Sequence, residues 1–587
     1  MPAAGAPAPA LLDRLLRPGR ASHRDVVIDL LWLAGLGLVL MGTGLGLRDP
    51  WPADEPRFAL VAQDMLRSGD WLFPRVGGDL YADKPPLFFW LMAASMAVTG
   101  SLRIGFLLPS LLAGLGTTAL VYDLLRRARG REAAFAGAFL LLITFQFVWQ
   151  ARQAQIDATL CFLTTLSLYA LLRHLLLGPA RGWFLLGWAA AGLGIITKGV
   201  GFLPLLVLLP FAVLVRRGWR SSAPRIGMLG IAGLGAMLVT IGLWFVPMVV
   251  ATSAGGELLA YRNEILFHQT MTRYADAWHH HEPVWFYAVK VVPFLWLPLI
   301  ALVPWLWPRW REALRNRDTL LAVLLAWVVI VLLFFSASSG KRGVYVLPAV
   351  PALAMAAGPW LPGLLRAAAT RRLAFVLACV LASLVAAATV YFVIDAHAAT
   401  RIAGDYGIHP VLPLACVAVG AAVALVAFRV RDGWLSYAAV LASLLVTVGL
   451  VVYPRIDAVR SARAFMERVE RASTGVPELG LVGAKEQYLL ELRRPSVNFG
   501  HARWRERERE AADAAAWLAE SPERALLVDN VAREACFGAA VTVELGRANR
   551  QQWFLVSGQP DTACVASGDR SRARLYVPAN ASLNTGG

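Results

Sequence analysis

Apolar segments recur along most of the chain and are separated by short polar connections. A helix that crosses a bilayer needs about 20 mostly apolar residues. The stretch 182–215 is too long for one helix, and Thr197-Lys198-Gly199 interrupts it, so we expect a hairpin of two short spans. The pattern then predicts thirteen spans, at 26–46, 104–125, 132–149, 156–177, 182–197, 199–215, 226–252, 284–307, 319–337, 343–362, 373–394, 410–428 and 433–453.

The segment 85–99 is apolar but short, and it opens with Pro85-Pro86. If it crossed the membrane, every later connection would change sides. Basic residues accumulate on the cytoplasmic side of membrane proteins. With 85–99 lying flat in the interface, the predicted cytoplasmic connections carry 23 basic residues against five acids. We therefore predict a cytoplasmic N-terminus and a C-terminus on the opposite, outer side.

This topology divides the chain into three parts. Residues 1–25 form a cytoplasmic tail, and residues 26–453 form the transmembrane domain, with outer loops at 47–103 and 253–283. Residues 454–587 alternate helix-like and strand-like segments, with strands expected at 478–483 and 524–529, which predicts a small α/β domain in the periplasm. Cys536 and Cys564 fall in this domain, where a disulfide is permitted, although the sequence leaves their pairing open.

Composition supports a membrane protein and changes the meaning of the charge. Of the 587 residues, 58% are hydrophobic and 16% are charged, which disfavours a soluble cytosolic enzyme, a disordered chain or a disulfide-rich secreted scaffold. The formal net charge of +17 would ordinarily suggest nucleic-acid binding. The excess lies in the cytoplasmic connections, so it indicates orientation, and we expect no nucleic-acid partner.

Only five of the 56 basic residues are lysines, and the topology places all five on or near the outer side. Lys84, Lys198 and Lys341 fall at the outer membrane edge, where they could bind a phosphate or simply anchor the chain at the interface. Lys84 belongs to the densest outer cluster, which also contains Asp54, Glu55, Arg57 and Asp83. Cations can bind a phosphate, and a carboxylate can accept a proton. Such a cluster at the membrane surface suits a reaction on a lipid-linked phosphate, although an ordinary charged loop is the alternative.

The segment 55–67 within the same loop predicts a helix along the interface. The apolar side chains that could face lipid there are Phe58, Leu60, Val61, Met65 and Leu66.

Three further segments contribute candidates on the outer side. Asp157 stands at the outer end of a span, where it is either a site acid or an acid facing the helix dipole. Lys341 and Tyr345 lie at the end of another span, and Arg273 in the loop 253–283 is a candidate phosphate ligand. The histidines of that loop suggest a divalent metal, with His268 and His280 as candidate ligands, but adjacent histidines make a poor chelate and no cofactor is required.

These segments resemble a known family. The segment DEPRFALVAQDMLRSGDWLFPRVGGDLYADKPPLFFWL is similar to the first outer loop of the bacterial protein O-mannosyltransferase-like family, and most closely to its lipid A 4-amino-4-deoxy-L-arabinose transferase branch. GLGIITKGVGFLPLL resembles the T-K-G-P hairpin of that family, and KRGVYVLPAVPALA resembles its K-x-x-Y-x-L-P-x-x-P segment. Val200 replaces the proline of the hairpin, and Asp83 stands where the family often has glutamate.

The resemblance implies a GT-C type membrane glycosyltransferase in the bacterial inner membrane, with its site facing the periplasm. Its donor would be a sugar on a polyprenyl phosphate such as undecaprenyl phosphate, and its acceptor lipid A or lipopolysaccharide, a glycan or a protein. Asp54 and Asp157 would be the catalytic acids. The residues that would bind the phosphate or the substrates are Glu55, Arg57, Asp83, Lys84, Arg273, Lys341 and Tyr345.

A transporter or flippase of lipid-linked sugars is the alternative, because charged residues at span ends would also suit a headgroup pathway. The sequence shows no internal inverted repeat and no acid at mid-span depth apart from Asp29, near the inner end of the first span. The interfacial first-loop motif favours the transferase.

Overall fold

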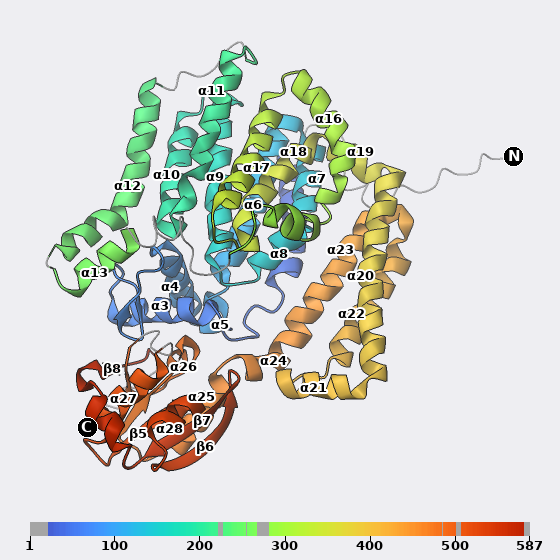
Figure 1. The fold of residues 1–587 in the computed structure, drawn as a ribbon. Helices are drawn as coiled ribbons and strands as arrows, with labels where there is room; N and C mark the ends of the chain where they lie inside the picture. The colour runs from blue at the N-terminus through green and yellow to red at the C-terminus, as the bar shows by residue number, and fades with distance from the viewer. Residues whose placement is uncertain are drawn as a thin grey trace.

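The computed structural model describes residues 22–220, 227–253, 255–266, 281–483, 485–500 and 506–579. A large bundle of helices forms one part of the molecule, and a smaller domain built around a sheet packs against one end of it (Figure 1). The helices α3 to α5 lie between these two parts.

Helices of differing length, most of them apolar, make up the bundle. They are α2 (His23–Gly37), α6 (Leu108–Arg129), α7 (Arg131–Leu142), α8 (Phe145–Ala151), α9 (Ile156–Leu175), α10 (Arg181–Lys198), α11 (Leu208–Arg216), α12 (Gly227–Thr252), α16 (Val303–Arg315), α17 (Thr319–Ala337), α18 (Ala349–Ala357), α19 (Leu361–Arg366), α20 (Ala368–Ile394), α22 (Val411–Phe428), α23 (Gly433–Thr447) and α24 (Tyr453–Arg460). Shorter connecting helices are α13 (Glu257–Asn263), α15 (Val292–Leu295) and α21 (Ala396–Tyr406).

Several of these helices continue through short 3-10 or π segments. These are η1 (Leu38–Gly42), η2 (Val200–Val207), η4 (Tyr287–Val291), η5 (Ile300–Leu302), η6 (Gly343–Val346), η7 (Gly358–Trp360), η8 (Val430–Asp432) and η9 (Val448–Val452). In the described part of the chain, nine helices are long and apolar enough to cross a membrane, or up to eleven if each bent pair is one span. Each predicted span overlaps a helix, but the count of thirteen remains a prediction.

Two predicted spans are bent where a straight helix was expected. The segment 284–307 turns by 97° between residues 287–295 and 300–315, and Pro298, which has no backbone N–H, lies in the break. The segment 132–149 turns by 67° after Leu142. The two breaks meet, because the Phe145 amide donates to the Leu297 carbonyl at 3.0 Å. This hydrogen bond pairs one backbone group from each break, which lipid could not do.

The first loop contains α3 (Glu55–Ser68), α4 (Leu87–Thr99), α5 (Leu102–Gly105) and a hairpin of β1 (Arg75–Val76) and β2 (Asp79–Leu80). The predicted helix over 55–67 is present as α3, but its predicted lipid-facing side is wrong. Phe58, Leu60, Val61 and Met65 are at most 5% exposed. They pack into a core that the loop shares with the C-terminal domain, and among the five only Leu66 is exposed.

The C-terminal segment folds as the predicted α/β domain around a six-stranded sheet. Its elements are α25 (Arg463–Ala472), β3 (Glu478–Leu481), α26 (Glu486–Leu490), β4 (Ser496–Asn498), α27 (Arg507–Leu518), β5 (Arg524–Asp529), α28 (Asn530–Cys536), β6 (Val541–Ala548), β7 (Gln551–Ser557), α29 (Thr562–Ser567), η11 (Arg570–Arg572) and β8 (Arg574–Tyr576).

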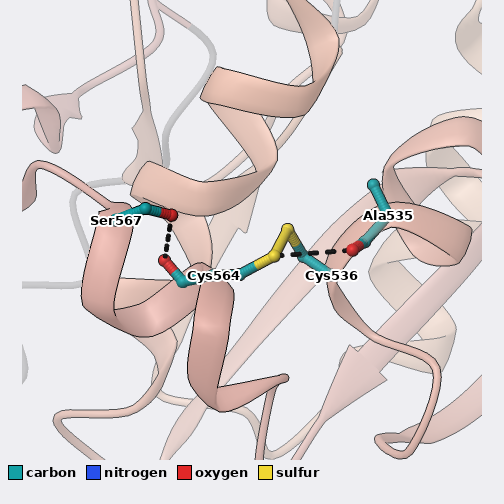
Figure 2. Close-up of a disulfide and its surroundings, with 4 residues drawn as sticks. All are labelled: Ala535, Cys536, Cys564 and Ser567. Atoms are coloured by element: carbon teal, nitrogen blue, oxygen red, sulfur yellow. Dashed lines mark hydrogen bonds between the residues drawn. A yellow bond between two sulfur atoms is a disulfide. The ribbon is translucent and has the colours of Figure 1, made fainter.

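The sheet has the order β6-β7-β5-β3-β4-β8, with β3 parallel to β4 and β5 and the remaining pairs antiparallel. The hairpin β6–β7 was not expected from the sequence. Cys536 and Cys564 form a disulfide that joins the end of α28 to α29, and Ser567 donates to the Cys564 carbonyl (Figure 2).

Candidate active site

Asp54 stands immediately before α3, at the end of the bundle that faces the C-terminal domain. Its carboxylate does not cap its own helix. One carboxylate oxygen, Oδ2, accepts hydrogen bonds from both terminal nitrogens of Arg342, at 3.2 and 3.3 Å. The Asp54 side chain is 25% exposed and that of Arg342 is 40% exposed. The pair is therefore held in place yet remains open to a substrate.

A second ion pair lies on the bundle side of the first. Asp157 is in the first turn of α9, and Lys198 is the last residue of α10. The Lys198 ammonium contacts Oδ1 of Asp157 at 2.5 Å, and their side chains are 17% and 11% exposed. The same ammonium lies 4.2 Å from the centre of the Tyr345 ring, where a cation–π contact adds to the attraction.

The two pairs form one electrostatic cluster. Burial by itself would lower the pKa of Arg342, but the carboxylates of Asp54 and Asp157, with Tyr345, outweigh burial and raise that pKa. Two carboxylates and two cations thus balance each other at the end of the bundle that faces the C-terminal domain. Because the four charged residues come from four distant segments, the fold and not local sequence assembles the site.

Polar contacts fix the backbone that carries Arg342. The Gln146 side-chain amide donates to the Gly343 carbonyl at 2.7 Å and accepts from the Trp296 indole at 2.6 Å. The Tyr287 hydroxyl donates to the Arg342 carbonyl at 3.4 Å. The bent segments described above therefore support the loop from which Arg342 reaches Asp54.

Lys341 and Glu55, which the sequence predicted as ligands, instead contact other parts of the protein. Lys341 is 4% exposed, and its ammonium donates to the carbonyls of Glu282 and Ser338, at 2.8 and 2.5 Å. Glu55 is 7% exposed and forms a buried ion pair with Arg48. Both residues hold loops in position in this structure, and the adjacent Arg342 takes the place in the cluster that the sequence suggested for Lys341.

The carboxylate of Glu55 also ties the first loop to the bundle. It accepts hydrogen bonds from the backbone amides of Trp51 and Ala154, each at 3.0 Å. Ala154 lies three residues before Asp157. Glu55 therefore joins the segment that carries Asp54 to the segment that carries Asp157.

The remaining first-loop candidates gather around Tyr81. Arg57 donates through Nε to Glu486 of the C-terminal domain at 2.7 Å. Burial would lower the pKa of Arg57, but Glu486 and Tyr81 raise it. Burial, together with the charge of Asp83, raises the pKa of Tyr81. Lys84 is partly buried and donates to the Asp83 carbonyl at 2.9 Å, so the two residues border this cluster.

Other predicted residues cannot be placed. Arg273, His268 and His280 lie outside the described residues. Within the described ranges, no group of three or more histidine, cysteine, aspartate or glutamate side chains is arranged to hold a metal ion.

The sequence placed Lys198 among three lysines at the outer membrane edge that could meet a phosphate, but it did not single out Arg342. The rarity of lysine, with five against 51 arginines, was a usable signal for Lys198. Arg342 had no comparable signal beyond its place beside Lys341 in a recognised motif.

Comparisons with known proteins agree with this architecture. Residues 83–244 match the family described as dolichyl-phosphate-mannose-protein mannosyltransferase. An undecaprenyl phosphate-alpha-4-amino-4-deoxy-L-arabinose arabinosyl transferase of Pseudomonas aeruginosa (strain UCBPP-PA14) is 35% identical over 321 residues, covering 52% of this chain and 55% of that protein. A second such transferase, from Pseudomonas fluorescens (strain Pf0-1), is 31% identical over 344 residues, covering 57% of this chain and 60% of its own length. The chain thus spans little more than half the length of the curated relatives it matches.

Solved structures extend the similarity to the whole fold. The crystal structure of ArnT from Cupriavidus metallidurans bound to undecaprenyl phosphate superimposes with a TM-score of 0.69 at 22% identity, covering 91% of this chain and 98% of that chain. Its apo state gives a TM-score of 0.70, also at 22% identity, covering 94% of this chain and all of that one. At this level of identity the similarity establishes the fold alone.

The chain is therefore a multi-pass membrane protein with the GT-C fold of the two ArnT structures. Its sequence is similar to the dolichyl-phosphate-mannose-protein mannosyltransferase family over residues 83–244 and, over about half its length, to undecaprenyl phosphate-alpha-4-amino-4-deoxy-L-arabinose arabinosyl transferases. The resemblance predicted from the three sequence motifs is confirmed.

Proposed function

We propose that this protein transfers a sugar from a polyprenyl-phosphate donor to an acceptor at the outer surface of the membrane. The observation that carries the proposal is the cluster in which Asp54 pairs with Arg342 and Asp157 pairs with Lys198. Two cations can receive a phosphate there while a carboxylate remains beside them. The relatives, which are named as transferases that use an undecaprenyl phosphate-linked sugar, support the same chemistry.

The reaction is a displacement at the anomeric carbon of the sugar. An acceptor oxygen forms a bond to that carbon while the bond to the phosphate oxygen breaks, and the polyprenyl phosphate leaves with the electron pair. Arg342 and Lys198 stabilise the charge that grows on the leaving phosphate. Asp54 orients the acceptor, or takes its proton where the acceptor is a hydroxyl.

The resemblance favours undecaprenyl phosphate-linked 4-amino-4-deoxy-L-arabinose as the donor and lipid A as the acceptor. A lipid A phosphate is already ionised and needs positioning more than deprotonation. A glycan or protein hydroxyl would need a base. The acceptor therefore decides whether Asp54 moves a proton or only orients its partner.

We place the protein in the bacterial inner membrane, with the site in the periplasm and the N-terminus in the cytoplasm. Ion pairs at the opposite end of the bundle support the prediction that the basic connections lie on one side. Arg129 of the predicted cytoplasmic connection 126–131 pairs with Asp318 of the connection 309–318, and Arg366 of the connection 366–372 pairs with Glu132, which directly follows 126–131. Basic connections on one side and the site on the other fit the positive-inside rule.

A transport pathway is less consistent with the structure. Asp29, the acid that such a pathway would need within a span, is 2% exposed. Its carboxylate accepts hydrogen bonds from Arg131 and the Tyr122 hydroxyl, each at 2.7 Å. Both oxygens of the Asp29 carboxylate are therefore engaged, and Asp29 lies at the end of the bundle opposite Asp54.

Purified protein in detergent provides the direct test. The enzyme is mixed with undecaprenyl phosphate-linked 4-amino-4-deoxy-L-arabinose and lipid A, and the product is detected by mass spectrometry. We expect lipid A to gain the mass of the sugar, and Asp54→Asn to slow the gain. The matched control is Asp405→Asn, because Asp405 is an exposed acid on α21. If neither lipid A nor any glycan or protein acceptor gains the sugar in detergent, the transferase proposal fails.

A further inference from the structure

The first loop and the C-terminal domain share one hydrophobic core. A single cluster of buried side chains runs from α3 and α4 into the sheet of the domain. It includes Phe58, Leu60, Val61 and Met65 of α3, Phe88 and Phe89 of α4, and Phe465, Tyr488, Leu489, Trp553 and Tyr576 of the domain. The apolar side of α3 is therefore covered by the C-terminal domain and α4.

Polar contacts hold both ends of α3 against the domain. Near its start, Arg57 pairs with Glu486 at 2.7 Å. Near its end, the Tyr576 hydroxyl donates to Asp64 at 3.0 Å, and both residues are at most 4% exposed. A helix fixed at both ends on one surface has little freedom to shift along it.

The hairpin that follows α3 is bound in the same way. The Asn498 side chain donates to the Gly77 carbonyl at 2.8 Å, and Arg574 forms an ion pair with Asp79. The approach at Gly77 is close, because a Cβ atom at this residue would lie 2.8 Å from Cδ1 of Leu489. The domain thus contacts the β1–β2 hairpin of the first loop at Gly77 and at Asp79.

A buried ionic junction joins the loop and the domain where both leave the bundle. Asp49 is 1% exposed and accepts two hydrogen bonds each from Arg103 and Arg463, at 2.7 to 3.0 Å. Arg463 is the first residue of α25 in the C-terminal domain. Asp457 accepts from the Asp49 amide at 2.9 Å and from the Trp51 indole at 2.8 Å. The segment that leads to Asp54 is therefore tied to the domain at its beginning.

We infer that the C-terminal domain is a positioning domain for Asp54: by completing the core of the first loop, it holds α3 so that Asp54 meets Arg342. The inference rests on the proposed function only in taking Asp54 as part of the site. Asp54 directly precedes the helix whose apolar side the domain covers, whereas Arg342 belongs to the bundle. A displacement of about 1 Å at a reacting group can reduce the rate about 100-fold.

The test uses the full-length protein with two variants on the domain side of the shared core, remote from the two ion pairs of the site. Tyr576→Phe removes the hydroxyl that contacts Asp64, and Leu489→Ala opens the contact with Gly77. The matched control is Leu575→Ala, because Leu575 lies on the same strand as Tyr576 and is 68% exposed. Hydrogen exchange of the α3 amides is measured together with kcat and the KM for the donor.

We expect both variants to raise exchange in α3 about tenfold while α9 and α17 keep wild-type protection. We also expect kcat to fall about five- to tenfold with the donor KM changed less than about twofold, and Leu575→Ala to match wild type. Unchanged exchange in α3, or raised exchange without a fall in kcat, overturns the inference. Where Leu489→Ala fails to fold, Tyr576→Phe decides, because it removes a single oxygen atom.

The exchange measurement also separates the two proposals. If the wild-type protein transfers no sugar but exchange in α3 still rises in the variants, the proposed function is wrong and the docking of α3 on the domain stands. If the wild type is active and the variants leave α3 and kcat unchanged, the proposed function stands and the positioning role is wrong.

Discussion

Asp54 and Arg342 are separated by 288 positions in sequence, yet a single carboxylate oxygen of Asp54 accepts from both terminal nitrogens of Arg342. This contact joins the first loop to the bundle. Asp54 directly precedes α3, which packs on the C-terminal domain. The position of this ion pair therefore depends on the first loop, the bundle and the C-terminal domain together.

Arg342 should matter more for turnover than for folding. We expect Arg342→Gln to reduce kcat about 100- to 1,000-fold, since removing one donor that stabilises developing charge has an effect of that size. Arg342→Lys should recover part of the loss, because lysine restores the charge without the planar fork. Arg311→Gln, at an exposed arginine on α16, serves as the control. Wild-type kcat in Arg342→Gln would remove this residue from the site.

Asp54→Asn tests whether Asp54 moves a proton. With a hydroxyl acceptor we expect kcat to fall about 100-fold or more, because general base catalysis contributes 10²–10⁴-fold. With a phosphate acceptor we expect a smaller loss. The measurement compares initial rates on both acceptors across pH. Near-normal turnover on a hydroxyl acceptor would exclude the base role and leave Asp54 an orienting residue.

Asp157 and Lys198 should act as a unit. Their side chains are largely buried, so removing one charge leaves the other without its partner. We expect Asp157→Asn and Lys198→Gln each to lower kcat, and the double variant to lose much less than the product of the two single losses. Kinetics of the four proteins in a double-mutant cycle give the coupling. Additive losses would show that the two residues act independently.

The sequence predicted the helices of the bundle well, because lipid requires long apolar segments whose length and composition are visible locally. It predicted the apolar pattern of α3 but assigned its apolar side to lipid. An amphipathic helix has the same pattern whether lipid or protein covers it. The covering residues, such as Tyr488 and Trp553, lie more than 400 residues further along the chain.

The acids of the candidate site were also predicted, since Asp54 and Asp157 fall at recognisable places on the outer side. Of their cationic partners, Lys198 was predicted only as one of the outer-edge lysines, and Arg342 was not predicted. Arg342 and Lys341 are neighbours with similar chemistry, and the direction in which each points depends on contacts from Gln146, Glu282 and Ser338. Such contacts between distant segments leave no local signal in one sequence.

The contact between α3 and the C-terminal domain should tighten as pH falls. Burial raises the pKa of the Asp64 carboxyl to about 6, although Tyr576, Arg67, the Gly77 backbone and Arg75 each act to lower it. The folded state therefore binds more protons than the unfolded state between about pH 4 and 6, so its stability increases as pH falls through that window. At neutral pH the charged form costs on the order of 2–3 kcal/mol.

Asp64→Asn should remove this part of the pH dependence. Burial also raises the pKa of Glu491 to about 7, so it titrates in the same direction. The difference between wild type and Asp64→Asn therefore isolates Asp64. Thermal unfolding, or hydrogen exchange of α3, at pH 5 and pH 8 checks the expectation. An equal pH response in the two proteins would contradict it.

Gln146 offers the sharpest test of how the bundle supports the site. Gln146→Leu leaves the Trp296 indole and the Gly343 carbonyl without their partner, so the loop that carries Arg342 should shift. We expect kcat to fall about tenfold or more, because small misplacements of a charge-stabilising donor are costly.

Gln146→Glu keeps the acceptor for Trp296 but loses the hydrogen bond donated to Gly343. If the Gly343 contact holds Arg342 in place, Gln146→Glu should be nearly as slow as Gln146→Leu, whereas recovery of wild-type kcat would assign the role to the Trp296 contact. Gln552→Leu is the control, because Gln552 is a glutamine of the C-terminal domain whose side chain donates to Glu544 at an exposed position.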